Sequence, residues 1–318
     1  MTERPDSDPH HDLDVLVLGD ARPDLWLRGK VEELVYDDRR RPVDEATLEL
    51  GGSGAVTAVA LSRLGLRSAF AGVVGDDACG WFVRDALAAS GVDVSALQVR
   101  GGTATGVSVV LTRGSGRAIL STPGGVAELT AELVPAELLA RVRHVHVGSY
   151  FAQTGLHAGL PELFATARAA GATTSIDPNA DPADRWNSGL LRILDRTDVL
   201  FPNSAEVRRI TGIDDVDVAA ESLTERGTTL AVKFGQGGGM VMRGAESMHV
   251  EAVPVDLVDR AGAGAAFDAG FIAARLDGEP PERCLRIAVV CGSHAVCTAG
   301  SLAGLPTREQ AFADVGTS

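Results

Sequence analysis

Residues 258–270 read Val258-Asp259-Arg260-Ala261-Gly262-Ala263-Gly264-Ala265-Ala266-Phe267-Asp268-Ala269-Gly270. A strand-like approach leads into Gly-Ala-Gly, and a run of small residues typical of a packed helix follows. Backbone N–H groups at the start of a helix point outward without intrahelical partners, and the helix dipole favours negative charge there. The stretch therefore predicts either an anion-binding turn or a tight strand-to-helix turn packed against a sheet.

Segments of strand length alternate with helical segments along most of the chain. The apolar run Val15-Leu16-Val17-Leu18, which ends in Gly19-Asp20, is typical of a buried parallel strand. Further strands are predicted at 68–74, 145–147, 173–176, 199–200 and 230–233, and helices at 54–64, 78–89, 156–170, 204–211, 218–226, 262–276 and 281–297. This alternation predicts an α/β fold with a doubly wound, mostly parallel sheet.

Two segments interrupt the alternation, at about 22–50 and 100–121. The first is polar and predicted to be irregular, and the second contains two short strands around a Gly-rich turn at 113–116. We expect the two segments to meet as a small β lid on a single domain that spans 13–318. The acidic, His-bearing residues 1–12 are expected to form a disordered tail.

The composition excludes some classes of partner. The formal net charge is -14 over 318 residues, which argues against a nucleic-acid or anionic-membrane surface. The N-terminus lacks the apolar region of a signal peptide, and no apolar run approaches the length of a membrane span. The four cysteines have no metal-site spacing and are predicted to be small buried residues. A cytoplasmic protein is the simplest expectation.

The 258–270 stretch resembles the C-terminal signature of the ribokinase-like (phosphofructokinase B) carbohydrate kinases, Asp-Thr-Thr-Gly-Ala-Gly-Asp-x-Phe-x-Ala-Gly. The matching positions are Asp259, Gly262, Ala263, Gly264, Phe267, Ala269 and Gly270. The resemblance covers nearly the whole chain and implies a ribokinase-like fold that transfers the γ-phosphate of ATP to a sugar hydroxyl. It implies that Gly262, Ala263 and Gly264 hold the transferring phosphate.

The chain departs from this signature at the catalytic position. The family's aspartate, which takes the proton of the acceptor hydroxyl, is replaced by Ala265. Asp268 lies nearly one helical turn further on and should not fill the same place. Because a general base typically contributes about 10²–10⁴-fold, we expect ligand binding to persist and turnover to be strongly impaired. The alanine is either an engineered substitution or the mark of a natural pseudoenzyme.

The resemblance also implies a sugar site near the N-terminus. Gly51 and Gly52 match a double glycine where the sugar approaches the backbone, and Asp24 matches an aspartate that binds sugar hydroxyls. Val56 stands where many members place a substrate-binding asparagine, so the hydroxyl pattern of the substrate is left open. On local pattern alone, the glycines could simply begin a helix and Asp24 could be a solvated loop acid.

The nucleotide side is implied by polar residues that follow predicted strands. Asn179 ends one strand, at the carboxyl edge where open α/β sheets bind ligands. Asn203 and Glu206 match a motif that positions phosphate oxygens and hydrated Mg²⁺, although both would equally suit a helix capping box. The residues expected along the ATP pocket are Lys233, Gly235, Gly238 and Gly292.

Two further implications concern cations and assembly. Arg260 and Ala261 replace the usual pair of threonines, beside Asp259, where the resemblance implies a loop for a monovalent cation such as K⁺. The resemblance also implies that the lid can pair with the lid of a second subunit, giving a homodimer. His144 and His146 alternate on one strand, where packing or polar contact is a better interpretation than a metal site.

Three alternatives to a sugar kinase are considered. The first is a non-catalytic protein that binds sugar or nucleotide, and the second is a nucleoside kinase of the same fold. The third, a dinucleotide-dependent oxidoreductase, is disfavoured because no G-x-G-x-x-G follows the first strand. The sequence does not name the sugar or the hydroxyl that is phosphorylated.

Overall fold

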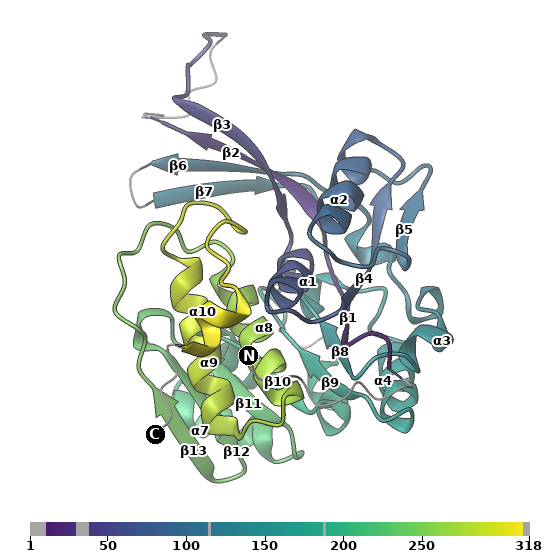
Figure 1. Ribbon diagram of the computed structural model, residues 1–318, viewed down its shortest axis with the longest axis vertical. Helices are drawn as coiled ribbons and strands as arrows, with labels where there is room; N and C mark the ends of the chain where they lie inside the picture. The colour runs from purple at the N-terminus through teal and green to yellow at the C-terminus, as the bar shows by residue number, and fades with distance from the viewer. Residues whose placement is uncertain (1–10, 30–37, 114–115, 187–188, 314–318) are drawn as a thin grey trace.

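The computed structural model describes residues 11–29, 38–113, 116–186 and 189–313. Within these residues two β-sheets form, a nine-stranded sheet in the core and a four-stranded sheet that projects from it (Figure 1). The predicted doubly wound, mostly parallel sheet with a small separate β lid is confirmed. The predicted tail at 1–12 lies almost wholly outside the described residues, as does the centre of the predicted turn at 113–116.

The large sheet has the strand order β13-β12-β11-β10-β9-β8-β1-β4-β5. Its strands are β1 (Val15–Leu18), β4 (Ser68–Gly75), β5 (Leu97–Arg100), β8 (His144–Val147), β9 (Thr173–Ile176), β10 (Val199–Leu200), β11 (Thr229–Lys233), β12 (Gly239–Arg243) and β13 (Glu246–Val250). The pairings from β5 to β11 are parallel, and β12 and β13 add an antiparallel edge. The carboxyl ends of the central strands therefore meet at one edge.

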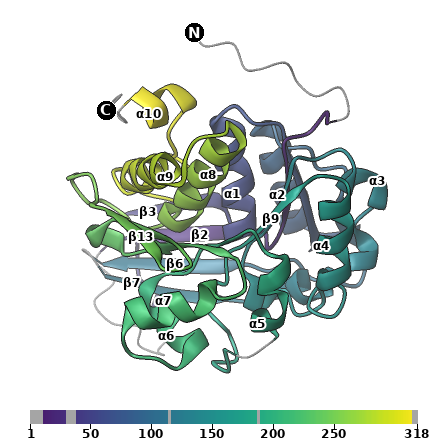
Figure 2. The same ribbon diagram turned by 90° about the horizontal axis from the view of Figure 1, so that it is seen from below.

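Helices cover both faces of this sheet (Figure 2). One face carries α1 (Ser53–Arg63), α2 (Ala78–Ala89), α8 (Ala263–Leu276), α9 (Pro281–Ala295) and α10 (Arg308–Ala313), and the other carries α3 (Ala136–Leu139), α4 (Leu160–Ala169), α5 (Leu190–Ile193), α6 (Ser204–Thr211) and α7 (Val216–Thr224). Strand β1 serves both cores, because Val15 and Val17 face the first and Leu16 and Leu18 the second. Alternate residues of a strand point to opposite faces.

Close backbone contact fixes α1 against the centre of the sheet. A Cβ atom on Gly54 would lie 2.7 Å from the Cα atom of Gly19, and one on Gly148 would lie 2.9 Å from the Cα atom of Gly54. The Asp20 carboxylate also accepts a hydrogen bond from the Gly54 amide at 3.1 Å. The loop that precedes α1 is therefore held at the carboxyl edge of β1 and β8.

The small sheet has the order β3-β2-β6-β7 and consists of β2 (Arg22–Arg28), β3 (Glu45–Gly51), β6 (Ser108–Arg113) and β7 (Gly116–Ser121). Strand β2 pairs antiparallel with β3 but parallel with β6, about 80 residues later. Trp26 and Val110 are neighbours on the face turned to the core, where both are 2% exposed. These four strands form the β lid.

Several sequence expectations need correction. The 22–50 segment is not irregular throughout, because β2 and β3 form within it, and their charges pair across the strands, as in Arg28–Glu45 at 3.4 Å. The helix predicted from 156 begins at Leu160. Cys284 and Cys291 are buried as predicted, but Cys79 is only half-buried, and Cys297 is exposed because it lies beyond the end of α9. No helix among the described residues is both long enough and apolar enough to span a bilayer.

Helix α8 is central to the first core, and Phe271 shows how much it contributes. Its ring is 1% exposed and stacks edge-on against Phe201, with ring centroids 5.4 Å apart. Phe271→Ala should lower the free energy of unfolding by about 3–5 kcal/mol, because it removes buried area and leaves a cavity. The matched change Val218→Ala, at a side chain that is 53% exposed on α7, should cost less than about 0.5 kcal/mol. Urea denaturation of both variants measures the difference, and similar losses would contradict this assignment of the core.

Candidate active site

The Gly-Ala-Gly turn forms the N-terminus of α8 at the carboxyl edge of the sheet. Gly262 adopts a left-handed conformation with φ 76°, and a Cβ atom there would lie 2.4 Å from the Ser301 carbonyl oxygen. The first amides of α8, from Ala263 onward, have no intrahelical acceptors. Ala265 sits in this first turn with 5% of its surface exposed. The turn can therefore hold an anion, and the side chain of Ala265 supplies no acid or base.

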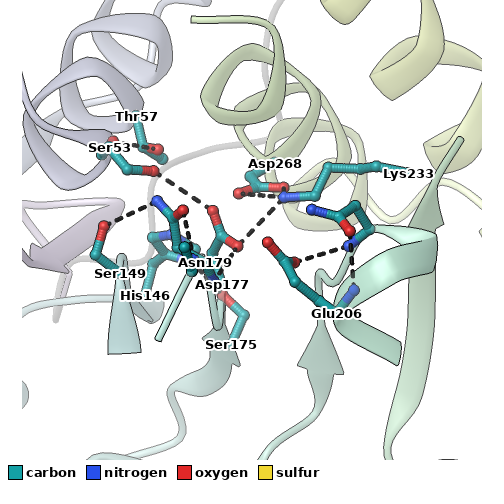
Figure 3. A network of polar contacts seen from close by, with 12 residues as sticks. Ser53, Thr57, His146, Ser149, Ser175, Asp177, Asn179, Glu206, Lys233 and Asp268 are labelled. Carbon is teal, nitrogen blue, oxygen red and sulfur yellow. Dashed lines mark hydrogen bonds and ion pairs between the residues drawn. The ribbon is translucent and has the colours of Figure 1, made fainter. Parts of the chain in front are cut away.

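A buried lysine lies beneath this turn. Lys233, the last residue of β11, places its Nζ atom 3.1 Å from Oδ1 of Asp268 in α8 and 3.3 Å from Oδ1 of Asp177, directly after β9 (Figure 3). The same Nζ atom lies 3.7 Å from where a Cβ atom on Gly264 would be. Lys233 therefore binds two carboxylates from different elements while it stays close to the anion-binding turn.

The carboxyl groups around Lys233 outnumber its single charge. Burial raises the pKa of Asp268 well above its usual range, and the charge of Asp177 adds to the rise against the opposing effect of Lys233. Burial also raises the pKa of Glu206 to about 7, and the neighbouring Asp177 charge contributes. Figure 3 shows the Glu206 carboxyl group pointing toward Asp177 and Lys233. Asp177, Glu206 and Asp268 therefore form a cluster with Lys233 that can hold a proton in addition to its ion pairs.

Helix α6 fixes Glu206 through a capping box. The Asn203 side chain accepts hydrogen bonds from the amides of Ala205 and Glu206, both at 2.9 Å, and Oε2 of Glu206 accepts one from the Asn203 amide at 2.8 Å. The capping interpretation is confirmed by these bonds. It leaves the rest of the Glu206 carboxyl group, which is 7% exposed, turned toward the cluster.

The predicted sugar residues meet on the other side of the α8 turn. A Cβ atom on Gly51 would lie 2.0 Å from Oδ2 of Asp24, and one on Gly52, where φ is 94°, would lie 2.5 Å from the Asp20 carbonyl oxygen. Oδ1 of Asp24 is buried without a hydrogen-bond partner, and burial raises the pKa of this carboxyl group. Val56 points into the core instead and is 3% exposed. Positions 51 and 52 therefore require glycine, because a side chain there would collide with Asp24 or with the Asp20 carbonyl oxygen.

Four of the seven residues predicted on the nucleotide side, Lys233, Gly235, Gly238 and Gly292, line one cavity of about 690 Å³. Its walls come from the loop after β11, the extended segment after β13, the start of α8 and one side of α9. Among its lining residues are the predicted Lys233, Gly235, Gly238, Ala263, Gly264 and Gly292. Apolar side chains dominate the wall formed by 252–257 and α9, which suits a flat heteroaromatic group. Asn179 and Asn203 are not among the lining residues.

Sequence patterns missed several residues of the site. Arg260 lines the cavity, and the extended segment 252–257 that faces it gave no signal beyond its apolar residues. Arg22 binds Asp20 at 2.8 Å and lies 3.9 Å from Asp24. Ser53 contacts Asp177 at 3.4 Å across 124 residues of sequence. Only the placement of these residues after strands or at helix starts could have pointed to them.

The described residues also limit where cations can bind. No group of three or more His, Cys, Asp or Glu side chains among them is arranged to hold a metal ion. His144 and His146 bind Thr173 and Ser175 at 2.7–2.8 Å, as a polar packing pair. The Asp259 carboxylate accepts hydrogen bonds from the amides of Ala261 and Gly300, and the Arg117 guanidinium lies 3.8 Å away. Asp259 therefore does not fit a cation-binding role.

Comparison with known proteins gives consistent matches over most of the chain. A family model described as pfkB family carbohydrate kinase matches residues 12–308. The ATP-dependent ribose-1-phosphate kinase of Halopiger xanaduensis is 32% identical over 280 residues, 88% of this chain and 90% of that protein. The nucleoside kinase of Methanothermobacter thermautotrophicus is 29% identical over 262 residues, 82% of each protein. The crystal structure of a protein from E. coli provisionally described as ribokinase II, with ATP and Mg²⁺, is 25% identical with a TM-score of 0.84, over 95% of this chain and 98% of that chain.

The raised pKa of Glu206 has a testable consequence for stability. Because its pKa is about 7 when folded and 4.5 ordinarily, the folded protein binds this proton more tightly than the unfolded chain. The resulting stabilisation is complete below about pH 4.5 and is lost as the pH rises through about 7. Glu206→Gln, which keeps an oxygen for the Asn203 amide, should remove this dependence. As the pH rises from about 5 to about 8, the free energy of unfolding of Glu206→Gln should increase by at most about 3 kcal/mol relative to that of the unaltered protein.

Urea denaturation at several pH values checks this expectation. Glu246→Gln, at an exposed position on β13, is the matched control and should leave the pH dependence unchanged. Stability curves that stay parallel for Glu206→Gln and the unaltered protein would show that the Glu206 proton is not held by folding.

Proposed function

The chain belongs to the pfkB family of carbohydrate kinases, and on this premise we propose that it transfers the γ-phosphate of ATP to a hydroxyl group of a carbohydrate. The observation that carries the proposal is the cavity of about 690 Å³, which opens onto Ala263 and Gly264 at the N-terminus of α8. ATP would lie in this cavity with its adenine between α9 and the 252–257 segment. Its phosphates would then reach the first amides of α8.

The carbohydrate would bind on the opposite side of the turn, under the β lid. Asp24 supports this placement, because no hydrogen bond from the described residues reaches its buried Oδ1 atom and a carboxylate can accept two hydroxyl hydrogen bonds. Gly51 and Gly52 leave the backbone accessible beside it. The core-facing position of Val56 suggests that this side chain shapes the pocket without binding a hydroxyl.

Magnesium fits the site through water. The Glu206 carboxyl group, turned toward Asp177 and Lys233, offers the oxygen donors that a hydrated Mg²⁺ prefers. When bound, the ion would supply positive charge to the phosphates. Lys233 and the α8 amides would stabilise the remaining charge on the moving phosphoryl group. Lid closure would exclude water and so protect ATP from hydrolysis.

Ala265 limits the chemistry of this site. Its methyl group stands at the position of the family's proton acceptor, so we propose that transfer is strongly impaired while binding persists. The same observation favours the second candidate, a pseudokinase that binds sugar or nucleotide without turnover. A nucleoside kinase is the third candidate, supported by the relative of that name in Methanothermobacter.

The outer face of the β lid supports a homodimer. Leu48, Leu25, Val109 and Leu120 stand in register across the four strands, opposite the face that carries Trp26. Leu48 and Leu120 are 52% and 59% exposed. Because a row of apolar side chains across an open sheet is costly in water, we propose that this face packs against the same face of a second copy.

Restoring the carboxylate tests the kinase function. Ala265→Asp should raise acceptor-dependent ATP turnover by about a hundredfold or more, the scale of a general base. The assay uses Mg²⁺ and a panel of sugars, sugar phosphates including ribose 1-phosphate, and nucleosides, with ATP and acceptor binding measured by calorimetry. The acceptor that responds identifies the substrate class. A variant that binds ATP and an acceptor normally but stays silent would refute the kinase proposal and favour the pseudokinase.

The dimer proposal is tested by charging the apolar row. Leu48→Glu combined with Leu120→Glu should convert a dimer into a monomer of 33.0 kDa in size-exclusion chromatography with light scattering. Val218→Glu, which places the same charge on α7 far from the lid, should leave the mass unchanged. A monomeric unaltered protein at micromolar concentration, or a dimer that survives both lid substitutions, would contradict the proposal.

A further inference from the structure

The Asp177 carboxylate lies between the two halves of the site. Its Oδ2 atom is 3.4 Å from the hydroxyl of Ser53, which begins α1 directly after the Gly51-Gly52 loop. Its Oδ1 atom is 3.3 Å from Nζ of Lys233, the atom that approaches Gly264. Figure 3 shows Asp177 between Ser53 on one side and Lys233 on the other. One carboxylate thus borders both the sugar loop and the phosphate turn.

Helix α8 links position 265 to the same ion pairs. Ala265 precedes Asp268 by three residues, so their β-carbons lie about 5–6 Å apart on neighbouring positions of the helix surface. Asp268 and Asp177 both contact Nζ of Lys233, at 3.1 and 3.3 Å. The place that a longer side chain at position 265 would occupy is therefore one helical turn from a carboxyl group that shares Lys233 with Asp177.

The other carboxyl groups nearby are committed to structural partners. Asp268 is completely buried and directs both oxygens at Lys233, at 3.1 and 3.4 Å. Glu206 binds the Asn203 amide within its capping box. At Asp177, Oδ1 is bound by Lys233 and by the Asn179 amide at 3.2 Å. Among the described residues, Oδ2 accepts a long, weak bond of 3.4 Å from the Ser53 hydroxyl, which a ligand hydroxyl can replace.

The backbone around Asp177 is held in an unusual conformation. Asn179 and Ser149 both adopt positive φ, at 52° and 55°, and the Asn179 side chain donates a hydrogen bond to Ser149 at 3.1 Å. Such conformations cost about 1–3 kcal/mol each in residues other than glycine and cluster at functional sites. The hydrogen bond between these two residues helps to hold the loop that presents the carboxylate in this conformation.

We propose that Asp177 accepts the proton of the acceptor hydroxyl in this chain, the task that Ala265 cannot perform. The inference rests on the proposed kinase function. The hydroxyl proton passes to Oδ2 of Asp177 while the hydroxyl oxygen forms a bond to the γ-phosphorus. The bond from that phosphorus to the bridging β–γ oxygen breaks, and ADP leaves with its electron pair. Lys233 keeps Oδ1 fixed, and the proton passes to water after product release.

The test compares Asp177→Asn in two backgrounds. In the unaltered chain, whose turnover is already reduced by the loss of the family's aspartate, the substitution should lower the residual acceptor-dependent turnover by about a hundredfold or more, because it removes the substitute base. In the Ala265→Asp background it should lower turnover by less than about fivefold, because the proton then has another acceptor. Any loss through disturbed packing or a weakened Lys233 pair appears in both backgrounds, so the difference between them isolates proton transfer.

Two controls accompany this comparison. Asp184→Asn, in the same loop but with 68% of its side chain exposed, should leave turnover unchanged in both backgrounds. Calorimetric dissociation constants for ATP and for the acceptor should change by less than about threefold in every variant, which shows that each is folded and binds its ligands.

The outcomes separate this inference from the kinase function itself. Equal losses in both backgrounds would overturn the role of Asp177 as a base and leave it a positioning residue. An unaltered chain without turnover beside an active Ala265→Asp variant would also overturn it, while the kinase function stands. If Ala265→Asp binds both ligands and transfers no phosphate, the kinase function fails and the inference fails with it.

Discussion

The ion pair of Lys233 with Asp177 and Asp268 is the constraint on which the rest of the site depends. One buried ammonium group joins the ends of β9 and β11 to the second turn of α8, so the anion-binding turn cannot shift independently of the sheet edge. Removing one member of a buried pair leaves an uncompensated charge at a cost of several kcal/mol. With Glu206 nearby, carboxyl groups exceed cations. Burial raises the pKa values of Asp268 and Glu206, and the charge of Asp177 adds to both rises.

Much of the fold followed from the sequence because its signals are local. The alternation of strands and helices, the Gly-Ala-Gly helix start and the Asn203–Glu206 capping box each depend on neighbouring residues. The lid strands β2 and β3 were missed because their charged residues are stabilised by pairing across strands, which no local pattern records. The short strand β5 was missed as well, since its four residues, of which Leu97 is buried and the other three are half-buried, carry little periodicity.

The chemistry of the site was predicted less completely, for a related reason. Positions of single residues that match a motif, such as Asp24 or Glu206, could be assigned, and the structure brings them to the same sheet edge. The Lys233 cluster joins residues up to 91 positions apart and three separate elements. Lys233 was interpreted through the glycines that follow it, and the ion pairs that bury it depend on tertiary packing alone. Asp259 shows that a match to a motif does not reveal the contacts of a side chain, since this carboxylate binds the amides of Ala261 and Gly300 and lies near Arg117.

The topology of the β lid bears on how the chain acquires its structure. Strand β2 needs β6 as its parallel neighbour, yet the whole of α1, β4, α2 and β5 lies between them in sequence. An isolated pair such as β2 and β3 is at best marginally stable in water. During synthesis β2 and β3 therefore remain without their third strand, with their leucines exposed, until about 60 further residues have been made. Long-range pairing of this kind slows folding and leaves hydrophobic surface exposed. The newly made chain is therefore most prone to aggregation before β6 has been synthesised.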